Sequence, residues 1–240
     1  RPVDIEGKVD SVKGKIALWE NKAVYSNVLG MIDLTSLTVS DTTSKIASMA
    51  SKMRGFNSLY PDLPMPASIC AYPNFAKTIA TTRGGCDYHI TVVGGCFPSS
   101  QSFLEVKIAE CVRAVKDGAD EVDIVLAHSA FNEGRYEDAA GEISAIGAAV
   151  RSENKNVVLK VILETGVLKD FEEIALASFL EMEAGADFIK TSTGKTEPAA
   201  TPQAAFIMCE CIKAFYKATG KKVGFKPAGG IATTEDAALY

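Results

Sequence analysis

Residues 187–195 read DFIKTSTGK, an apolar run that follows the loop at 184–186 and ends in a polar turn that contains a glycine. The run predicts a strand with Lys190 in its middle. A second stretch, VGFKPAGG at 223–230, repeats the arrangement around Lys226. A buried ammonium group is costly unless it is paired or loses its proton. A neutral amine is a nucleophile toward carbonyl carbon, so the two stretches predict a site where one lysine lowers the pKa of the other. The alternative is that both lysines reach the rim of the protein and only pair with carboxylates.

The composition is that of an ordinary globular protein. The chain has 240 residues, a hydrophobic share of 47% and a formal net charge of −5. No basic stretch is interleaved with aromatics, which argues against nucleic-acid binding. No apolar run reaches membrane-spanning length, and residues 1–4 do not read as the start of a signal peptide. The six cysteines form no CxxC pair, so a reduced, cytoplasmic setting is expected.

Strand-like and helix-like stretches alternate from about residue 31 onward. Residues 1–30 read as a helical extension, because apolar residues recur there at steps of three and four. Strands are expected at 31–35, 67–73, 89–95, 121–126, 157–164, from 187, and at 223–228. Helices are expected from 40, near 74–82, and at 103–117, 136–152, 170–184, 201–218 and 233–240.

This alternation predicts parallel strands joined by right-handed crossovers. We expect one domain over residues 1–240, an α/β TIM (β/α)8 barrel with an extra N-terminal helix. Such a barrel needs eight strands in roughly 250 residues, whereas seven are visible. We therefore expect the native chain to continue past Tyr240. A doubly wound open sheet is the alternative, but its usual glycine-rich first turn has no counterpart after Leu34.

Polar residues interrupt several of the apolar strands. In a parallel barrel the carboxyl ends of the strands meet at one face, so distant residues can share a pocket. Three lysines beside two carboxylates would leave an excess of positive charge, which lowers the pKa of one lysine. Alternatively, the carboxylates simply neutralise the lysines, and the cysteine is a small core residue. The residues are Asp33, Cys70, Asp123, Lys160, Lys190 and Lys226.

Three further features of the chain bear on the site. Lys160 reads as a charge partner rather than the nucleophile, and Glu164, at a strand end, could orient a lysine or face solvent. Two turns, at 193–195 and 229–231, place glycines just past a strand, where backbone N–H groups can meet a phosphate. Their residues are Thr193, Gly194, Lys195, Gly229, Gly230 and Ile231. The two histidines, His89 and His128, have no partner at metal-ligand spacing, which predicts no catalytic metal.

From about residue 30 to the end, the sequence closely resembles the 2-deoxyribose-5-phosphate aldolase family. Its two lysine signatures match 187–195 and 224–230. Further strand motifs match at 32–35 (IDLT), 69–73 (ICAYP), 120–125 (DEVDIV) and 159–166 (LKVILETG).

The resemblance implies a class I aldolase on a TIM barrel, independent of metals and of other cofactors. Its reaction is the reversible cleavage of 2-deoxy-D-ribose 5-phosphate to acetaldehyde and glyceraldehyde 3-phosphate. By position, Lys190 would form the Schiff base, Lys226 would keep it unprotonated, and Asp123 would transfer protons. The two glycine turns would contact substrate and phosphate, while Asp33, Thr35, Cys70 and Lys160 would form a supporting network. The implied partners are small phosphorylated sugars and aldehydes, and many members are dimers.

The chain departs from the family pattern in three places. Ala232 stands where many members have arginine, and the loop at 94–100 differs from the usual Phe-Pro-x-Gly turn. The eighth strand, with its phosphate loop, does not follow Tyr240, and Tyr240 itself should not be taken for the tail tyrosine of some members. Two alternatives therefore stay open. One is an aldolase-fold protein with reduced or lost catalysis that acts as a binding or scaffold protein, and the other is a class I aldolase for a different phosphorylated sugar.

Overall fold

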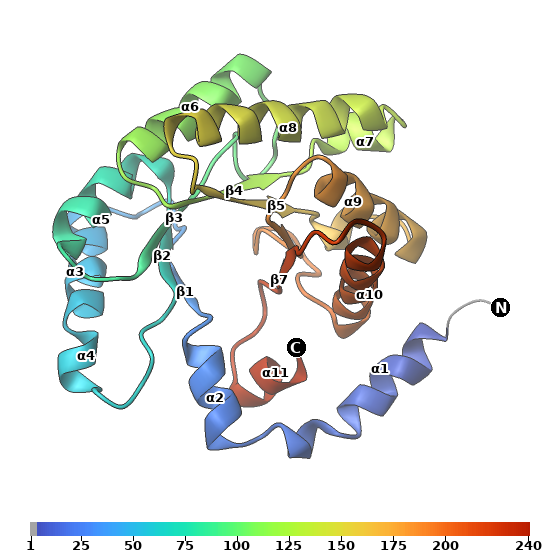
Figure 1. The fold of residues 1–240 in the computed structure, drawn as a ribbon, viewed down its shortest axis with the longest axis horizontal. Coiled ribbons are helices and arrows are strands. Elements are labelled where there is room, and N and C mark those ends of the chain that lie inside the picture. Colours follow the sequence, from blue (N-terminus) through green and yellow to red (C-terminus); the bar gives the residue numbers. More distant parts are fainter. Residues whose placement is uncertain (1–3) are drawn as a thin grey trace.

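The computed structural model describes residues 4–240, which form a parallel sheet of seven strands in sequential order, β1 to β7. The sheet curls into an incomplete barrel with helices on its outside (Figure 1). A doubly wound sheet would reverse its strand order at a switch point, so the sequential order confirms the barrel. No eighth strand is present among residues 4–240. The strands are β1 (Asp33–Thr35), β2 (Ser68–Ala71), β3 (His89–Val93), β4 (Glu121–Val125), β5 (Val158–Ile162), β6 (Phe188–Lys190) and β7 (Gly224–Lys226).

Helices cover the outer face of the sheet, as the alternating pattern predicts. Two short helices, α4 (Phe56–Leu59) and α7 (His128–Asn132), were not expected from the sequence. No helix in the part of the chain that the structure describes is both long and apolar enough to cross a membrane. The others are α3 (Thr43–Arg54), α5 (Ala76–Arg83), α6 (Leu104–Lys116), α8 (Tyr136–Glu153), α9 (Phe171–Glu183), α10 (Pro202–Thr219) and α11 (Thr234–Leu239).

The N-terminal extension is helical but broken. It holds α1 (Ile5–Lys13), a short 3-10 turn and α2 (Lys22–Leu29), and residues 1–3 of the expected extension lie outside the described part. Asn21 starts α2 by accepting hydrogen bonds from two backbone N–H groups, as a helix cap does. The extension crosses the open side of the barrel, where α1 packs on α10 and α2 packs on α11 (Figure 1). Val9 of α1 is buried in this contact.

The strands alternate between two kinds of surroundings. Ile90, Val122 and Leu159 point outward into the apolar core beneath the helices. Their neighbours Thr91, Asp123 and Lys160 point inward and contact one another. Because successive side chains of a strand point to opposite faces, one polar residue at every second position is enough to give the barrel a charged interior.

A short motif, Gly-Ala-Asp, starts both β4 and β6. Its aspartate holds the new strand to the preceding one: Asp120 accepts from the backbone N–H of Ile90, and Asp187 accepts from that of Leu159, each at 2.8 Å. An arginine pairs with each carboxylate, Arg83 with Asp120 and Arg151 with Asp187. These contacts fix the register of the strands that carry the central charged residues.

Candidate active site

Lys160 of β5 is the centre of the charged interior. Its side chain is 3% exposed, and its Nζ lies 2.9 Å from Asp123 Oδ1, 3.8 Å from Asp33 Oδ2 and in contact with Glu121. Burial by itself lowers the pKa of a lysine, but these carboxylates outweigh it and hold the pKa of Lys160 well above its usual range. Lys160 is therefore a permanent cation, in agreement with its interpretation as a charge partner.

Lys190 of β6 is paired with the same aspartate. Its Nζ donates to Asp123 Oδ2 at 2.7 Å, so Asp123 is shared by two lysines. Burial is the largest single effect and lowers the pKa of Lys190, but the charge of Asp123, its hydrogen bond and further contributions together outweigh burial, and the net shift is upward. Burial likewise raises the pKa of Asp123, and the two lysines reverse the shift and lower it. In this arrangement Lys190 is a buried ammonium.

Lys226 of β7 has a carboxylate of its own. Its Nζ lies 2.8 Å from Asp33 Oδ2 and donates to the backbone oxygen of Met31 at the same distance. Lys190 and Lys226 are partners in the register of β6 and β7, so the two lysines are neighbours, as predicted. The expected lowering of the pKa of Lys190 is wrong for this arrangement, because each ammonium is paired with a separate carboxylate.

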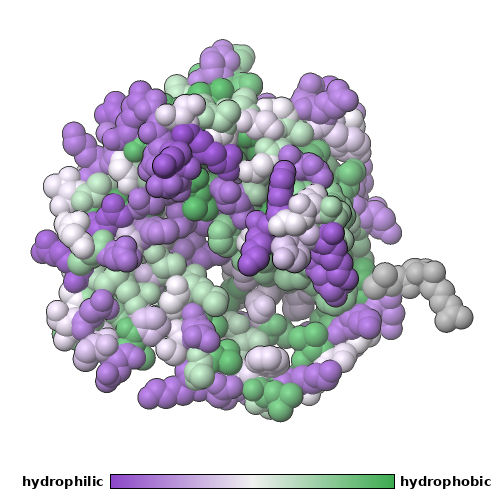
Figure 2. Space-filling view, in the orientation of Figure 1, coloured by the Kyte–Doolittle hydropathy of each residue, from purple (hydrophilic) through white to green (hydrophobic). Residues whose placement is uncertain are grey.

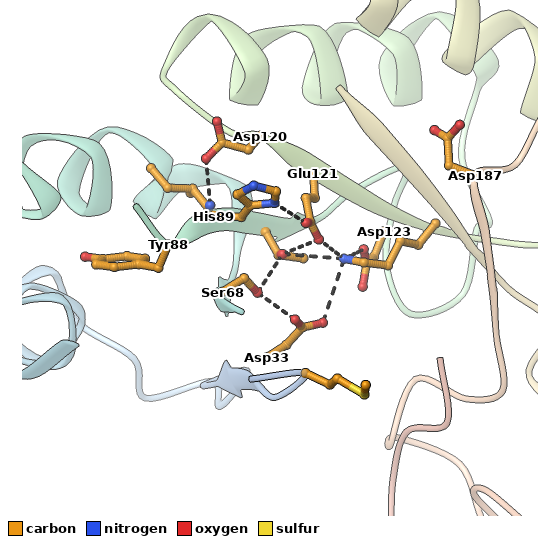
Figure 3. Close-up of polar contacts among 12 residues, drawn as sticks. Asp33, Ser68, Tyr88, His89, Asp120, Glu121, Asp123 and Asp187 are labelled. Atoms are coloured by element: carbon orange, nitrogen blue, oxygen red, sulfur yellow. Dashed lines mark hydrogen bonds and ion pairs between the residues drawn. The ribbon is translucent and has the colours of Figure 1, made fainter. Parts of the chain in front are cut away.

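The expected excess of positive charge is also wrong, because the sequence interpretation missed a third carboxylate. Glu121 of β4 accepts from Thr91 Oγ1 at 2.9 Å and contacts Lys160. Thr91 Oγ1 also lies 2.8 Å from Ser68 Oγ, and Ser68 donates to Asp33 (Figure 3). His89 of β3 completes this group, with its Nδ1 2.6 Å from Glu121 Oε1. The signal was the period of two: Glu121 precedes Asp123 by two residues and His89 precedes Thr91 by two, so each pair shares the inner face.

A cavity of about 520 Å³ opens beside the two lysines. It lies between β1, β7, α2 and α11, and the space-filling view is hollowed on this side of the sheet (Figure 2). Apolar side chains, including Val28 and Phe225, form most of its wall. Several of the predicted site residues and the ring of Tyr240 line it together: Asp33, Thr35, Lys190, Lys226, Gly229 and Ile231.

The turn after β6 is anchored from within the protein. Glu164 is buried and accepts from the backbone N–H of Thr193 at 3.1 Å and from its hydroxyl. Thr193 Oγ1 then accepts from the backbone N–H of Lys195. Glu164 thus neither orients a lysine nor faces solvent, which corrects both sequence-based interpretations. The Nζ of Lys195 donates to the backbone oxygen of Leu37, which follows β1, so this side chain crosses the mouth of the barrel.

The turn after β7 lies against the turn after β6. Gly229 has a φ of +84°, and a Cβ built on it would lie 2.6 Å from the Cβ of Ala199 and 3.5 Å from the Cα of Gly194. A residue with a side chain would be strained at this φ and would also clash. The two predicted glycine turns are therefore in contact, and Gly229 and Ile231 of the second turn line the cavity. Gly230 follows with a φ of +78° and is exposed.

Cys70 of β2 packs inside the barrel, with Leu37 and Val93, against the partly buried rings of Tyr72 and Phe97. Burial raises the pKa of its thiol to about 11. Cys70 is therefore a neutral packing group beside the charged residues, as the small-core interpretation predicts. In residues 4–240, no three His, Cys, Asp or Glu side chains gather in a way that could hold a metal ion.

Comparison with known proteins places this site in a family context. Residues 31–239 match the model of the DeoC/LacD family aldolases. A Caenorhabditis elegans protein, provisionally named a deoxyribose-phosphate aldolase, is 40% identical over 225 residues, which are 92% of this chain and 72% of that protein. The solved structure of QR15, described as an aldolase, is 30% identical to this chain and has a TM-score of 0.75. The match covers 89% of this chain and 86% of the QR15 chain. The tetrameric deoxyribose phosphate aldolase of Aeropyrum pernix shares the fold, with 24% identity and a TM-score of 0.78 over 95% of this chain and 87% of its own.

Proposed function

The chain belongs to the DeoC/LacD aldolase family, and from that premise we propose that it cleaves 2-deoxy-D-ribose 5-phosphate reversibly to acetaldehyde and D-glyceraldehyde 3-phosphate, through an imine on Lys190. The observation that carries the proposal is the buried Lys190–Asp123 pair, 2.7 Å apart, in a side-chain network that opens on a cavity of about 520 Å³. An amine at the wall of a largely apolar cavity, next to a carboxylate that can move protons, is equipped for carbonyl chemistry.

The first step joins the sugar to the enzyme. Lys190 Nζ first gives up its proton to solvent, and its lone pair then attacks C1 of the open-chain aldehyde. The oxygen of C1 leaves as water, so the product is an imine that takes up a proton on nitrogen. Lys226, which pairs with Asp33 of β1 and is the register partner of Lys190, keeps a positive charge beside the oxygen of C1 while charge develops there.

The second step breaks the C2–C3 bond. Asp123 accepts the proton of the C3 hydroxyl, and the C–O electrons form the carbonyl of glyceraldehyde 3-phosphate. The electron pair of the C2–C3 bond moves toward the iminium nitrogen and leaves a two-carbon enamine on Lys190. A proton returned to C2 and one water molecule then release acetaldehyde and restore the amine.

The phosphate has a complementary surface at the cavity mouth. The backbone N–H groups of Thr193 and Lys195 are already bonded within the protein. The remaining N–H groups of the two turns, at Gly194, Gly229 and Gly230, are our candidates for phosphate contacts, and Lys195 brings a cation from the same segment. Such groups recognise phosphate through hydrogen bonds and charge. The provisional name of the Caenorhabditis elegans relative supports the choice of a phosphorylated deoxysugar over other aldehydes.

The test is chemical trapping of the imine. The protein is incubated with acetaldehyde and borohydride, digested, and analysed by mass spectrometry for an ethylated lysine. We expect the ethyl group on Lys190, no adduct in Lys190→Ala, and at least about a thousandfold loss of sugar-phosphate cleavage in that variant. An adduct confined to another lysine, or none, would refute the proposed nucleophile.

Lys195→Ala separates phosphate recognition from imine chemistry. Acetaldehyde carries no phosphate, so this variant should be trapped as fast as the parent protein. Its KM for 2-deoxyribose 5-phosphate should rise roughly tenfold, because one charged contact is lost. An unchanged KM would refute the assignment of Lys195 to the phosphate.

A further inference from the structure

The barrel interior is electrically balanced, and this balance sets a condition on the chemistry. Three ammonium groups face three carboxylates, all joined by contacts of 3.8 Å or less. When Lys190 loses its proton, one unpaired negative charge stays behind in a buried place, which is unfavourable. A compensating positive charge elsewhere in the network would remove this penalty. The groups are Lys160, Lys190, Lys226, Asp33, Glu121 and Asp123.

His89 is positioned to carry that charge. It is the first residue of β3, and its side chain is 55% exposed. It lies at the amino ends of the strands, whereas the turns that follow β6 and β7 lie at the carboxyl ends. Its Nδ1 is 2.6 Å from Glu121 Oε1, and Glu121 extends inward from there to Lys160 (Figure 3).

A continuous line of contacts joins His89 to Lys190. Glu121 contacts Lys160, Lys160 lies 2.9 Å from Asp123, and Asp123 lies 2.7 Å from Lys190. The three inner members are 10% exposed or less, so water screens the interactions between them weakly. Negative and positive charges alternate along this line of contacts. A change of charge at His89 therefore alters how strongly Asp123 is paired with Lys190 at the other end.

We propose that His89 is a positioning residue that takes a proton from solvent at one end of the barrel and thereby favours the neutral amine of Lys190 at the other end. A charged imidazolium competes with Lys160 for Glu121. Lys160 is then more strongly drawn to Asp123, and Asp123 holds the ammonium of Lys190 less tightly. The catalytic meaning of this coupling rests on the proposed imine mechanism, but the coupling itself does not.

The surroundings of His89 leave Glu121 as its one charged contact among the described residues. On β2, the residue in register with it is Ser68, and its backbone N–H donates to the oxygen of Ala67. On β4, the neighbouring Asp120 is already paired with Arg83 of α5. Lys160 of β5 and Asp33 of β1 are reached through Glu121 and through Ser68, respectively. Histidine is the side chain that changes charge between about pH 5 and 8, so the coupling should be visible in that range.

The test measures the protonation of Lys190 without any aldolase reaction. Lysine amines are labelled briefly with trace acetic anhydride between pH 6 and 9, and the labelled fraction of Lys190 is read by mass spectrometry. His89→Gln keeps a neutral hydrogen-bonding side chain, and His89→Arg keeps a permanent charge next to Glu121. We expect Lys190 to be labelled roughly three- to tenfold less in His89→Gln than in the parent at pH 6, and by a similar factor more in His89→Arg at pH 8.

Lys213→Gln is the matched control, because it removes one positive charge from the exposed, outer face of α10. It should leave the labelling of Lys190 unchanged. Equal labelling profiles in the parent, His89→Gln and His89→Arg would overturn the proposal, as would an equal shift in the control. Trapping with acetaldehyde and borohydride is run on the same samples. If the labelling shifts as expected but no imine forms on Lys190, the coupling stands and the proposed function fails.

Discussion

Glu181 of α9 is a buried carboxyl group with no partner. It is 0% exposed, and neither of its side-chain oxygens makes a hydrogen bond with any residue that the structure describes. Burial raises the pKa of Glu181 well above its usual range, which favours the protonated form of the group in the folded protein. In the unfolded chain it ionises above about pH 4.3. The unfolded state therefore gains stability relative to the folded state as the pH rises.

Glu181→Gln should remove this pH-dependent destabilisation. At pH 5 the variant and the parent should have similar free energies of unfolding, and at pH 8 the variant should be more stable by on the order of 2 kcal/mol. Urea denaturation at the two pH values measures the difference. Glu183→Gln, two residues along and exposed, is the control and should behave like the parent at both. A Glu181→Gln advantage that does not grow with pH would contradict the assignment of a protonated carboxyl.

Asp123 has two roles that one substitution can separate. It raises the pKa of Lys190, which opposes imine formation, and it is the proposed base in bond cleavage. In Asp123→Asn the amine should lose its proton more easily, so trapping with acetaldehyde should persist and extend to lower pH by at least about one unit. Cleavage of the sugar phosphate should fall by roughly 10²–10⁴-fold. Trapping and cleavage rates that change together would contradict these separate roles.

At the scale of the strands, Gly224 of β7 leaves room for its neighbour on β6. A Cβ on Gly224 would lie 2.2 Å from the ring of Phe188, the residue opposite it in the register. Gly224→Ala should therefore destabilise the protein by about 1–3 kcal/mol. Phe188→Leu should relieve the clash, so the double variant should be less destabilised than the two single changes added together. Additive losses in chemical denaturation would show that the ring is not what requires a glycine.

The elements themselves were largely predictable from the sequence, because each depends on local pattern. Every predicted strand exists, with ends displaced by at most a few residues, for example 157–164 against Val158–Ile162. The missed helices α4 and α7 are only four and five residues long, too short to show a periodic pattern. The break between α1 and α2 was also missed, since an amphipathic pattern can continue through a turn.

Which side chains would lie in the site was less predictable than the strands that carry them. Lys190, Lys226 and Asp123 stood out because each interrupts an apolar run. Glu121 did not, because it begins a strand directly after Asp120, where two adjacent acids read as a polar boundary. The upward pKa shift of Lys190 comes mainly from Asp123, a carboxylate that the sequence did single out, so what the sequence lacked here was the 2.7 Å distance between the two groups. Electrostatics is a sum over neighbours weighted by distance, and the sequence names the charges but not the distances that decide the sign of the sum.

At the scale of the molecule, one connected set of hydrogen bonds and ion pairs takes a side chain from each of the seven strands. It runs from Asp33 of β1 through the middle strands to Lys190 of β6. Lys226 of β7 then pairs with Asp33 of β1. These two strands are not hydrogen-bonded neighbours in the sheet, so this ion pair joins the two edges across the open side of the barrel. The charges of the proposed active site therefore also link the two ends of the curled sheet.

The pKa shifts of the set give the sign of its pH dependence. Burial raises the pKa of Asp33, Glu121 and Asp123, but the lysines of the set outweigh burial, so the net pKa of each carboxyl group is lowered. A carboxyl group with a lowered folded-state pKa contributes stability above its unfolded value and loses it as the pH falls through the folded value. The parent protein should therefore have a nearly constant contribution from this set between about pH 5 and 8 and lose it in acid.

Lys160→Met tests whether Lys160 is the centre of this set. The change leaves the surrounding carboxylates without their shared cation, and removing one member of a buried ion pair destabilises a protein by about 3–5 kcal/mol. The pKa of each carboxyl should then rise, so the variant should recover part of its stability between pH 7 and 5, where the parent changes little. Lys107→Met is the matched control, because Lys107 is equally buried but pairs with the partly exposed Glu142 of α8, outside the barrel. Urea denaturation of both variants at pH 5 and 7 should show a recovery of stability at pH 5 in Lys160→Met and none in Lys107→Met. Equal behaviour of the two variants would mean that the barrel interior does not act as one electrostatic unit.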